Sequence, residues 1–405
     1  MMFATDKNKH IISHPLKTIS ALVLLIASAL FIIGCGEKNK PVESSVNNNR
    51  LHKYFYKRFE GRVEGKGDLT MNLSGKDSVL TGDIYFKNSG VPEFFTFNSK
   101  IHANNSVRIS LHARNSNIMH NDNSREELSG KFISNNKIEG EFINYNTGSK
   151  NKFKLKENYS AGSYKFRMEN ASRTYGSRES GGAGIEYIFP QFEDKVSGTL
   201  SMINNKILKN ITGSYGEIGT GKNLKNIESE MNDFIDRFMK FEKDPLFPSN
   251  YKPFWEDSFY SSVVFNSRNV LVLENIDFRY EGGAHPNTFY TFYNFNTLTG
   301  KEISLSDLFA NGYKPKLDNI GEKKFRENYH IGKNESLEKR GYFLKNHKFH
   351  LNNNFAIFAS GLLFKFNPYE IAAYVYGAPE VFILYKDLNG LLKKKSVLSE
   401  LINRK

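Results

Sequence analysis

Three carboxylates, Glu281, Asp307 and Glu370, stand beside the most distinctive turns of the chain. General acid–base catalysis on a glycan needs two carboxylates that are held in complementary protonation states. Nothing in the sequence singles out one pair of the three for those roles. A hydrolase or transferase that acts on cell-wall glycans with two of these groups is therefore an open alternative.

Two other segments look like known ligand sites but lack an essential residue. Residues 216–223 (GEIGTGKN) nearly match a phosphate-binding loop, yet Asn223 stands where Ser or Thr must hold magnesium. His347 and His350 are three residues apart, but no further ligand follows at a zinc-site spacing. We therefore expect surface positions at both segments, with no nucleotide, no metal and no other cofactor.

One loop, residues 280–287 (YEGGAHPN), has an unusual composition. Its two glycines permit backbone angles that other residues avoid, and its His-Pro-Asn sequence forms a rigid polar turn ahead of a strand. Two interpretations stay open: a tight strand-to-strand loop in which the histidine caps backbone groups, or a recognition loop. The candidate partner-binding residues of this loop are Gly282, Gly283, His285, Pro286 and Asn287.

Residues 51–158 carry strand patterning almost throughout. Apolar and polar residues alternate with period two, which gives each strand one buried and one wet face and predicts an antiparallel sheet. Clusters of Asn, Ser, Gly and Lys separate the strands, as hairpin turns require. The predicted strands include residues 69–73, 80–86, 107–111, 128–132, 138–142 and 153–155.

Residues 161–405 mix helices with strands. Leu224–Met239 has apolar residues at helical spacing, and Pro315 suits the first turn of a charged helix over residues 315–345. The other predictions are strands at 164–168, 289–295, 355–366 and 381–385, a hairpin turn at 266–269, a loop at the Gly-rich residues 181–184, and a final helix over 388–401. We predict an α+β fold: an N-terminal antiparallel β module followed by a mixed α+β domain.

The first 35 residues resemble a bacterial lipoprotein signal peptide. A basic start with three lysines leads into the apolar run Ile19–Ile33, which is short for a transmembrane helix. Gly34 directly precedes Cys35, the single cysteine of the chain, as in a lipobox. We expect cleavage before Cys35, acylation of the new terminus with palmitate-like chains, and stable attachment to a membrane.

These features define the expected organisation. A signal peptide occupies 1–34, the acylated cysteine and a flexible tether 35–50, the β-rich module 51–158, and the α+β domain 161–405. With 405 residues, a formal charge of +13 and one cysteine, the chain is neither a disulfide scaffold nor a Cys-rich zinc protein. The positive charge is spread along the chain rather than gathered in one stripe, so nucleic acid is not an expected partner.

Three segments occur in a distinctive order. The Gly282–Asn287 loop is followed by residues 293–309 (YNFNTLTGKEISLSDLF) and then by residues 367–371 (NPYEI). Because these segments occur in this order, the region from about 160 to 400 resembles the family catalogued as domain of unknown function 3298, the RsiV-like domain. The resemblance places a companion region at about 161–260 and the signature region at about 261–400.

The resemblance implies a binding module on the outer side of a membrane. The best-known relatives recognise lysozyme, and others sit beside a peptidoglycan deacetylase domain, whose Asp and His metal ligands do not follow here. We therefore expect a non-catalytic module for a muramidase or for peptidoglycan, and a purely structural surface lipoprotein remains open. The expected place is the cell envelope, periplasmic or surface-exposed, with the outer membrane favoured in a cell with two membranes. Further candidate contacts are Pro368, Tyr369, Tyr374 and Tyr376.

Overall fold

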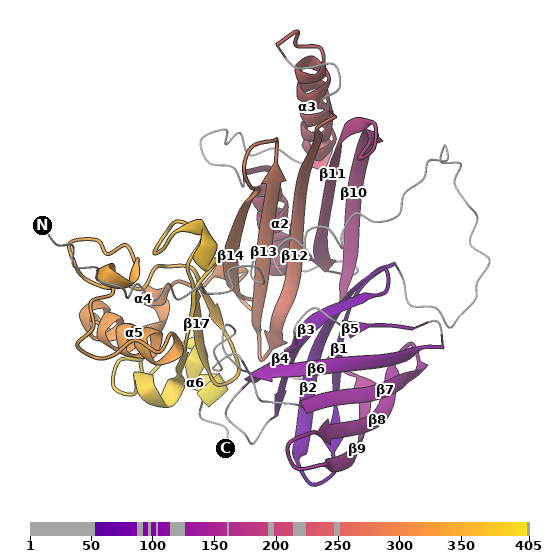
Figure 1. Cartoon of the computed structure of the whole chain (residues 1–405). Helices are drawn as coiled ribbons and strands as arrows, with labels where there is room; N and C mark the ends of the chain where they lie inside the picture. The colour runs from indigo at the N-terminus through magenta and orange to yellow at the C-terminus, as the bar shows by residue number, and fades with distance from the viewer. Residues whose placement is uncertain are drawn as a thin grey trace, which may run out of the picture. The chain divides into compact units, whose positions relative to one another are not determined.

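The computed structural model describes residues 53–86, 92–95, 99–102, 104–113, 126–159, 162–192, 198–213, 224–246 and 252–402 (Figure 1). The predicted signal peptide, Cys35, the tether and residues 216–223 lie outside these ranges. The described residues belong to one compact unit, Val46–Lys405. Among them, every helix is too short or too polar to span a membrane.

The first sheet is antiparallel and comes entirely from residues 54–157. The strands are β1 (Tyr54–Val63), β2 (Gly67–Lys76), β3 (Val79–Phe86), β4 (Pro92–Phe95), β5 (Ser99–Lys100), β6 (Ser106–Ala113), β7 (Glu126–Ser134), β8 (Lys137–Asn144) and β9 (Ser149–Glu157). Pairing runs in chain order from β1 to β4, passes from β4 to β6, and continues in order to β9, while the short β5 pairs with β3. Because β1 also pairs with β9, the sheet closes on itself.

The period-two pattern is confirmed in this sheet. Its alternate apolar residues, among them Phe59, Leu69 and Phe142, form one buried cluster. All six segments predicted as strands lie within β2, β3 and β6 to β9. The side chains fill the interior, as expected for a closed sheet of this strand number.

The second sheet has the order β10-β11-β12-β13-β14-β15. Its strands are β10 (Phe166–Ser177), β11 (Gly181–Phe192), β12 (Phe254–Ser267), β13 (Val270–Tyr280), β14 (Asn287–Asn296) and β15 (Lys301–Glu302). The pair β11–β12 is parallel, and the connection between them carries α2 (Gly198–Gly213) and α3 (Leu224–Glu242), which pack on one face of the sheet (Figure 1). The helix predicted at Leu224–Met239 is thus confirmed.

The loop predicted at residues 181–184 is wrong, because these residues begin β11. Gly182 lies opposite Gly176 on β10, and a Cβ atom at Gly182 would collide with the carbonyl oxygen of Tyr175. The glycines here allow close approach of two strands rather than a loop. The hairpin turn predicted at 266–269 is confirmed, since Arg268 and Asn269 both have positive φ between β12 and β13.

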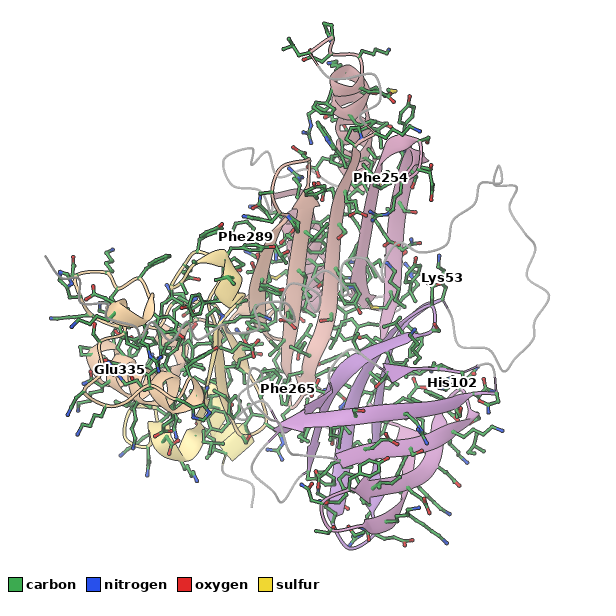
Figure 2. The ribbon with its side chains drawn as sticks, viewed as in Figure 1. Lys53, His102, Phe254, Phe265, Phe289 and Glu335 are labelled. Atoms are coloured by element: carbon green, nitrogen blue, oxygen red, sulfur yellow. The ribbon has the colours of Figure 1, made fainter. Side chains whose placement is uncertain are left out.

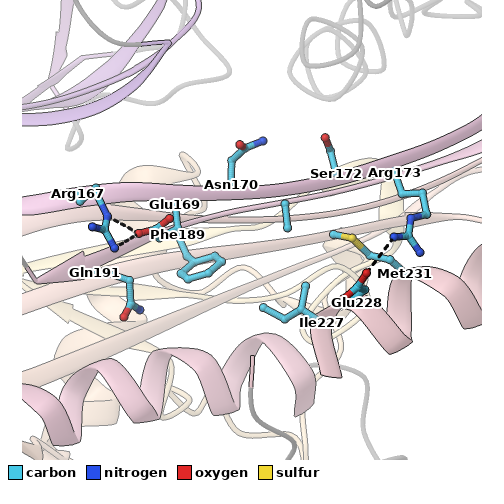
Figure 3. A pocket seen from close by; sticks show the side chains of 11 residues that line it. Arg167, Glu169, Asn170, Ser172, Arg173, Phe189, Gln191, Ile227, Glu228 and Met231 are labelled. Carbon is cyan, nitrogen blue, oxygen red and sulfur yellow. Dashed lines mark hydrogen bonds and ion pairs between the residues drawn. The ribbon is translucent and has the colours of Figure 1, made fainter. Parts of the chain in front are cut away.

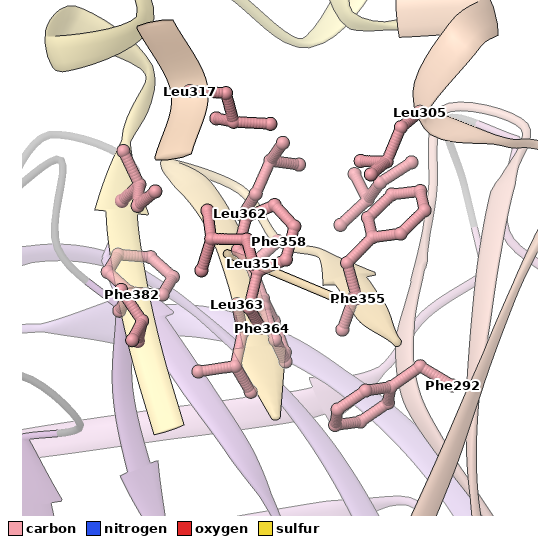
Figure 4. Close-up of a cluster of buried hydrophobic side chains, with 14 of the residues drawn as sticks. Phe292, Leu305, Leu317, Leu351, Phe355, Phe358, Leu362, Leu363, Phe364 and Phe382 are labelled. Atoms are coloured by element: carbon pink, nitrogen blue, oxygen red, sulfur yellow. The ribbon is translucent and has the colours of Figure 1, made fainter. Parts of the chain in front are cut away.

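The C-terminal part packs a small three-stranded sheet against helices. The sheet contains β16 (Phe355–Ile357), β17 (Gly361–Lys365) and β18 (Glu380–Leu384). The helical elements are α4 (Leu305–Leu308), α5 (Lys314–Asn328), η1 (Glu338–Arg340), η2 (Tyr374–Tyr376), η3 (Tyr385–Leu388) and α6 (Val397–Ile402). Figure 4 shows their shared core, in which Phe292 of β14 joins Phe355 and Phe364.

Three predictions in this part need correction. The segment 355–366 is two strands rather than one, and the helix from Pro315 ends at Asn328, shortly before His330 takes a positive φ. The helix predicted over 388–401 forms only as α6, because residues 391–393 bond to the backbone of Leu308 and Ala310 in an extended conformation. The described part of the chain has a mixed fold in which strands dominate, so the α+β prediction holds only in its broad sense.

Candidate functional site

The structure brings two predicted segments together although they are far apart in the sequence. The Nε2 atom of His285 lies 3.0 Å from the hydroxyl of Tyr369. The His285 ring stacks on Tyr374 with centroids 3.9 Å apart and planes inclined by 15°. The ring centroids of Tyr369 and Tyr374 lie 5.8 Å apart. His285, Tyr369 and Tyr374 therefore form one group, called here the His285 cluster.

The glycine-rich loop presents His285 from the β13–β14 connection. Gly282 and Gly283 have φ of 93° and 99°, values that an L-residue adopts only with strain. The Nδ1 atom of His285 lies 2.9 Å from the carbonyl oxygen of Pro286. A carbonyl can only accept, so in the neutral ring Nδ1 carries the proton and Nε2 accepts from the Tyr369 hydroxyl. His285 therefore both binds its own backbone and faces the second segment.

Tyr369 sits in a strained turn. The amide of Glu370 donates to the carbonyl of Asn367 at 3.0 Å, with Pro368 and Tyr369 as the two central residues. Tyr369 has φ +67°, and this position of such a turn normally holds glycine. A non-glycine residue here costs about 1–2 kcal/mol. The Tyr369 side chain is nevertheless 55% exposed, and strain combined with display is typical of binding sites.

Asparagine side chains attach this turn to the free edge of β14. The amide of Tyr290 donates to Asn367 Oδ1 at 2.7 Å, and Asn354 Nδ2 donates to the Tyr290 carbonyl at 2.8 Å. The amide of Phe292 donates to Asn354 Oδ1 at 2.8 Å. Side chains thus supply the hydrogen bonds that a neighbouring strand would give. Because β14 begins directly after the His285 loop, these bonds fix the two halves of the cluster relative to each other.

A buried charge lies behind the same edge. The Lys365 ammonium contacts Glu274 at 2.7 Å and Glu380 at 3.2 Å, and it lies 3.8 Å from the ring centroid of Tyr290. Burial raises the pKa of the Tyr290 hydroxyl, and the nearby ammonium partly opposes this. Neither Lys365 nor Asn354 was predicted as a site residue. A lysine in the apolar run GLLFKF was a signal for the first, whereas nothing marked the second.

Tyr376 and the exposed residues around it complete the surface. The Tyr376 hydroxyl donates to the carbonyl of Arg340 at 3.0 Å, and its ring lies 5.4 Å from Tyr342. The structure therefore pairs Tyr376 with Tyr342 and not with His285. Val375, which is 47% exposed, lies between the two tyrosines of η2. Phe289 on β14 is another exposed aromatic residue (Figure 2).

The three carboxylates of the catalytic alternative have separate partners. Glu281 pairs with Arg237 at 2.9 Å, and Glu370 accepts from the amide of Asn367 at 2.8 Å. Asp307 accepts from the amide and hydroxyl of Ser304 at 2.8 and 2.6 Å, contacts that hold the pKa of Asp307 below its usual value. In the described part of the chain no hydrogen bond joins any two of the three.

The two histidines considered as metal ligands also have separate partners. His347 Nδ1 lies 2.9 Å from a Glu338 carboxylate oxygen, and His350 Nδ1 lies 2.8 Å from one of Asp318. The described residues contain no group of three or more His, Cys, Asp or Glu side chains that could hold a metal ion.

A groove of about 510 Å³ lies between β10, β11 and the start of α3 (Figure 3). Its floor is apolar, with Phe189, Ile227 and Met231. Its charges are paired: Arg167 with Glu169, and Arg173 with Glu228 at 3.6 Å. The groove therefore has no charge preference for a ligand.

Comparisons with known proteins bear on the C-terminal part. Residues 306–386 match the family described as "Protein of unknown function (DUF3298)". This match contains the Asn367–Ile371 segment, whereas the His285 loop lies before it. Searching the curated proteins gave no match.

Two solved structures are similar to the chain. A DUF3298 family member from Bacteroides fragilis covers 60% of this chain and 100% of its own, with 18% identity and a TM-score of 0.50. A DUF3298 family protein from Pseudomonas aeruginosa covers 57% and 94%, with 18% identity and a TM-score of 0.43. At this identity the first likeness concerns the fold alone. The chain carries a DUF3298 domain at residues 306–386.

Proposed function

We propose that this protein is a cell-envelope lipoprotein whose C-terminal part is a non-catalytic binding module for a wall-related partner, a muramidase or peptidoglycan. The observation that carries the proposal is the His285 cluster. It joins two candidate segments that are far apart in the sequence, and it places an exposed tyrosine on a strained turn.

The chemistry of the cluster suits recognition better than catalysis. Tyr369 and Val375 offer apolar area to a partner, and the Tyr369 hydroxyl adds a polar group. Such a surface suits the face of a sugar ring or an aromatic hot spot in a protein interface. The separate structural contacts of Glu281, Asp307 and Glu370 support a role without catalysis.

The anchoring part of the proposal depends on the sequence. Acylation at Cys35 would keep the binding module at a membrane surface in the cell envelope. Mass spectrometry of the protein from its native membrane tests this: a mature chain that begins with diacylated Cys35 supports it. A chain that retains residues 1–34 would contradict it, and Cys35→Ser should then leave membrane attachment unchanged.

The binding part is tested with the full chain, purified in a non-ionic detergent. It is titrated against a muramidase panel and against purified peptidoglycan fragments, at low and physiological salt. Saturable binding that is lost in the double variant His285→Ala, Tyr369→Ala supports the proposal. Tyr145→Ala is the matched control, because Tyr145 is a 50% exposed tyrosine in the β8–β9 turn. Undiminished binding by the double variant would place the contact elsewhere, and no binding by the wild-type chain would remove both partners.

A further inference from the structure

A second concave surface lies away from the His285 cluster, at the end of β14. It is a hollow of about 560 Å³ between the β12–β13 turn, the turn after β14, α4 and the segment that leads into α6. Arg268, Lys394 and Lys395 line it, and it is called here the basic hollow. None of these residues belongs to the contacts described for the cluster.

The charge of the basic hollow is strongly positive. Asp307 is the one carboxylate among the described residues that line it. That carboxylate is already bound by Ser304, and Lys393 and Lys301 lie within electrostatic reach of it. Three cations thus line the hollow beside one carboxylate, so the described residues leave it with a net positive charge, in contrast to the paired charges of the groove beside α3.

Several hydrogen-bond donors in the basic hollow are unused. Within the described part of the chain, the side chains of Lys394 and Lys395 have no hydrogen-bond or ion-pair partner. The Ser396 hydroxyl is buried and has no hydrogen-bond partner there either. Arg268 is held in place by donating to the carbonyl of Leu401 at 2.9 Å. A guanidinium that is held in place beside unpaired ammonium groups can bind an anion.

We infer that the basic hollow binds a phosphate group, as a phosphomonoester or a phosphodiester. A phosphate offers several strong acceptor oxygens in a tetrahedral arrangement. These suit the Arg268 guanidinium of the β12–β13 turn together with the ammonium and hydroxyl donors of the segment before α6. Leu298, which is 61% exposed, lines the same hollow and gives it an apolar side. The phosphate could belong to a phospholipid headgroup or to a water-soluble phosphodiester.

Calorimetric titration of the full chain with inorganic phosphate and with glycerol 3-phosphate tests the inference, at constant ionic strength. The variant Lys394→Gln, Lys395→Gln removes two exposed cations and should weaken binding about tenfold or more, since a hydrogen bond to a charged group contributes about 1.5–3 kcal/mol. The matched control is Lys152→Gln, Lys154→Gln, which removes two exposed lysines of β9. It should bind as the wild-type chain does.

Three results would overturn the inference: no binding by the wild-type chain, equal affinity in the Lys394/Lys395 variant, or equal weakening in the control. The last would mean that net charge alone attracts phosphate. The source of the phosphate is then distinguished by comparing glycerophosphoglycerol with dihexanoyl phosphatidylglycerol below its micelle concentration. Tighter binding of the lipid, reduced by Leu298→Ser, supports a headgroup site, and equal binding supports a water-soluble phosphodiester. The variant His285→Ala, Tyr369→Ala should leave all these affinities unchanged, so this test does not depend on the proposed function.

Discussion

Replacing Tyr369 by glycine should separate two effects: the role of its exposed ring in partner binding and the effect of its backbone strain on the stability of the fold. The left-handed backbone of Tyr369 costs about 1–2 kcal/mol, and glycine removes that strain. Glycine also gains freedom in the unfolded chain, which lowers stability by roughly 0.5–1 kcal/mol relative to alanine. Tyr369→Gly should therefore be more stable than Tyr369→Ala by up to about 1.5 kcal/mol, because both lose the ring and its contact with His285 equally.

The comparison is made by urea unfolding of both variants, with binding of the partner measured on the same samples. We expect both variants to lose partner binding equally, since each lacks the exposed ring. Tyr145 provides the control: it lies in a turn without a positive φ, so there alanine should be the more stable replacement. Greater stability of Tyr369→Ala over Tyr369→Gly would refute the strain, and full binding by Tyr369→Gly would refute the role of the ring.

Three further predictions concern what supports the cluster. Lys365→Met leaves the buried Glu274 and the partly buried Glu380 without their ammonium and should lower the free energy of unfolding by about 3–5 kcal/mol, seen as a lower urea midpoint. Asn354→Ala should speed hydrogen exchange at the Phe292 amide, which loses its acceptor; an unchanged rate would mean that the edge is held by other contacts. The lowered pKa of Asp307 stabilises the fold above its unfolded pKa of about 4, and this stability is lost as the pH falls through the folded pKa. Ser304→Ala should flatten the acid limb of the stability–pH curve, whereas an unchanged limb would contradict the coupling.

The sequence predicted elements whose cause is local. Residues close together in the sequence determine three such elements: the period-two strands of residues 54–157, the helix α3, and the turn at Arg268 and Asn269. The structure confirms all three. Failures came where distant contacts decide. Residues 391–393 have good helix formers, yet backbone bonds to Leu308 and Ala310 hold them extended. Gly-rich residues 181–184 suggested a loop because the opposing glycine on β10 could not be known.

The candidate site shows the same limit. Composition marked the His285 loop through its turn chemistry, whereas the Pro368–Tyr369 turn was named through the family resemblance. Their contact depends on Asn354 and Asn367, whose side chains pair with β14. An asparagine in an apolar region has many structural uses, so its residue type alone does not reveal that it replaces a strand. The contact between the two segments could therefore not be predicted from the sequence.

The strain at Tyr369 persists because the turn is fixed from several sides. Glu370 accepts from the amide of Asn367 and from Asn352 Nδ2 at 2.8 and 2.9 Å, and Asn367 in turn binds β14. A strained residue survives only where its surroundings determine the backbone so completely. The cluster presents aromatic rings to a partner rather than carboxylate or ammonium groups, so it should bind that partner with little dependence on salt. The basic hollow relies on exposed ammonium groups, which salt screens strongly. Ionic strength should therefore distinguish the two surfaces in one titration series: partner binding that weakens steeply with salt would move the contact from the cluster to the hollow.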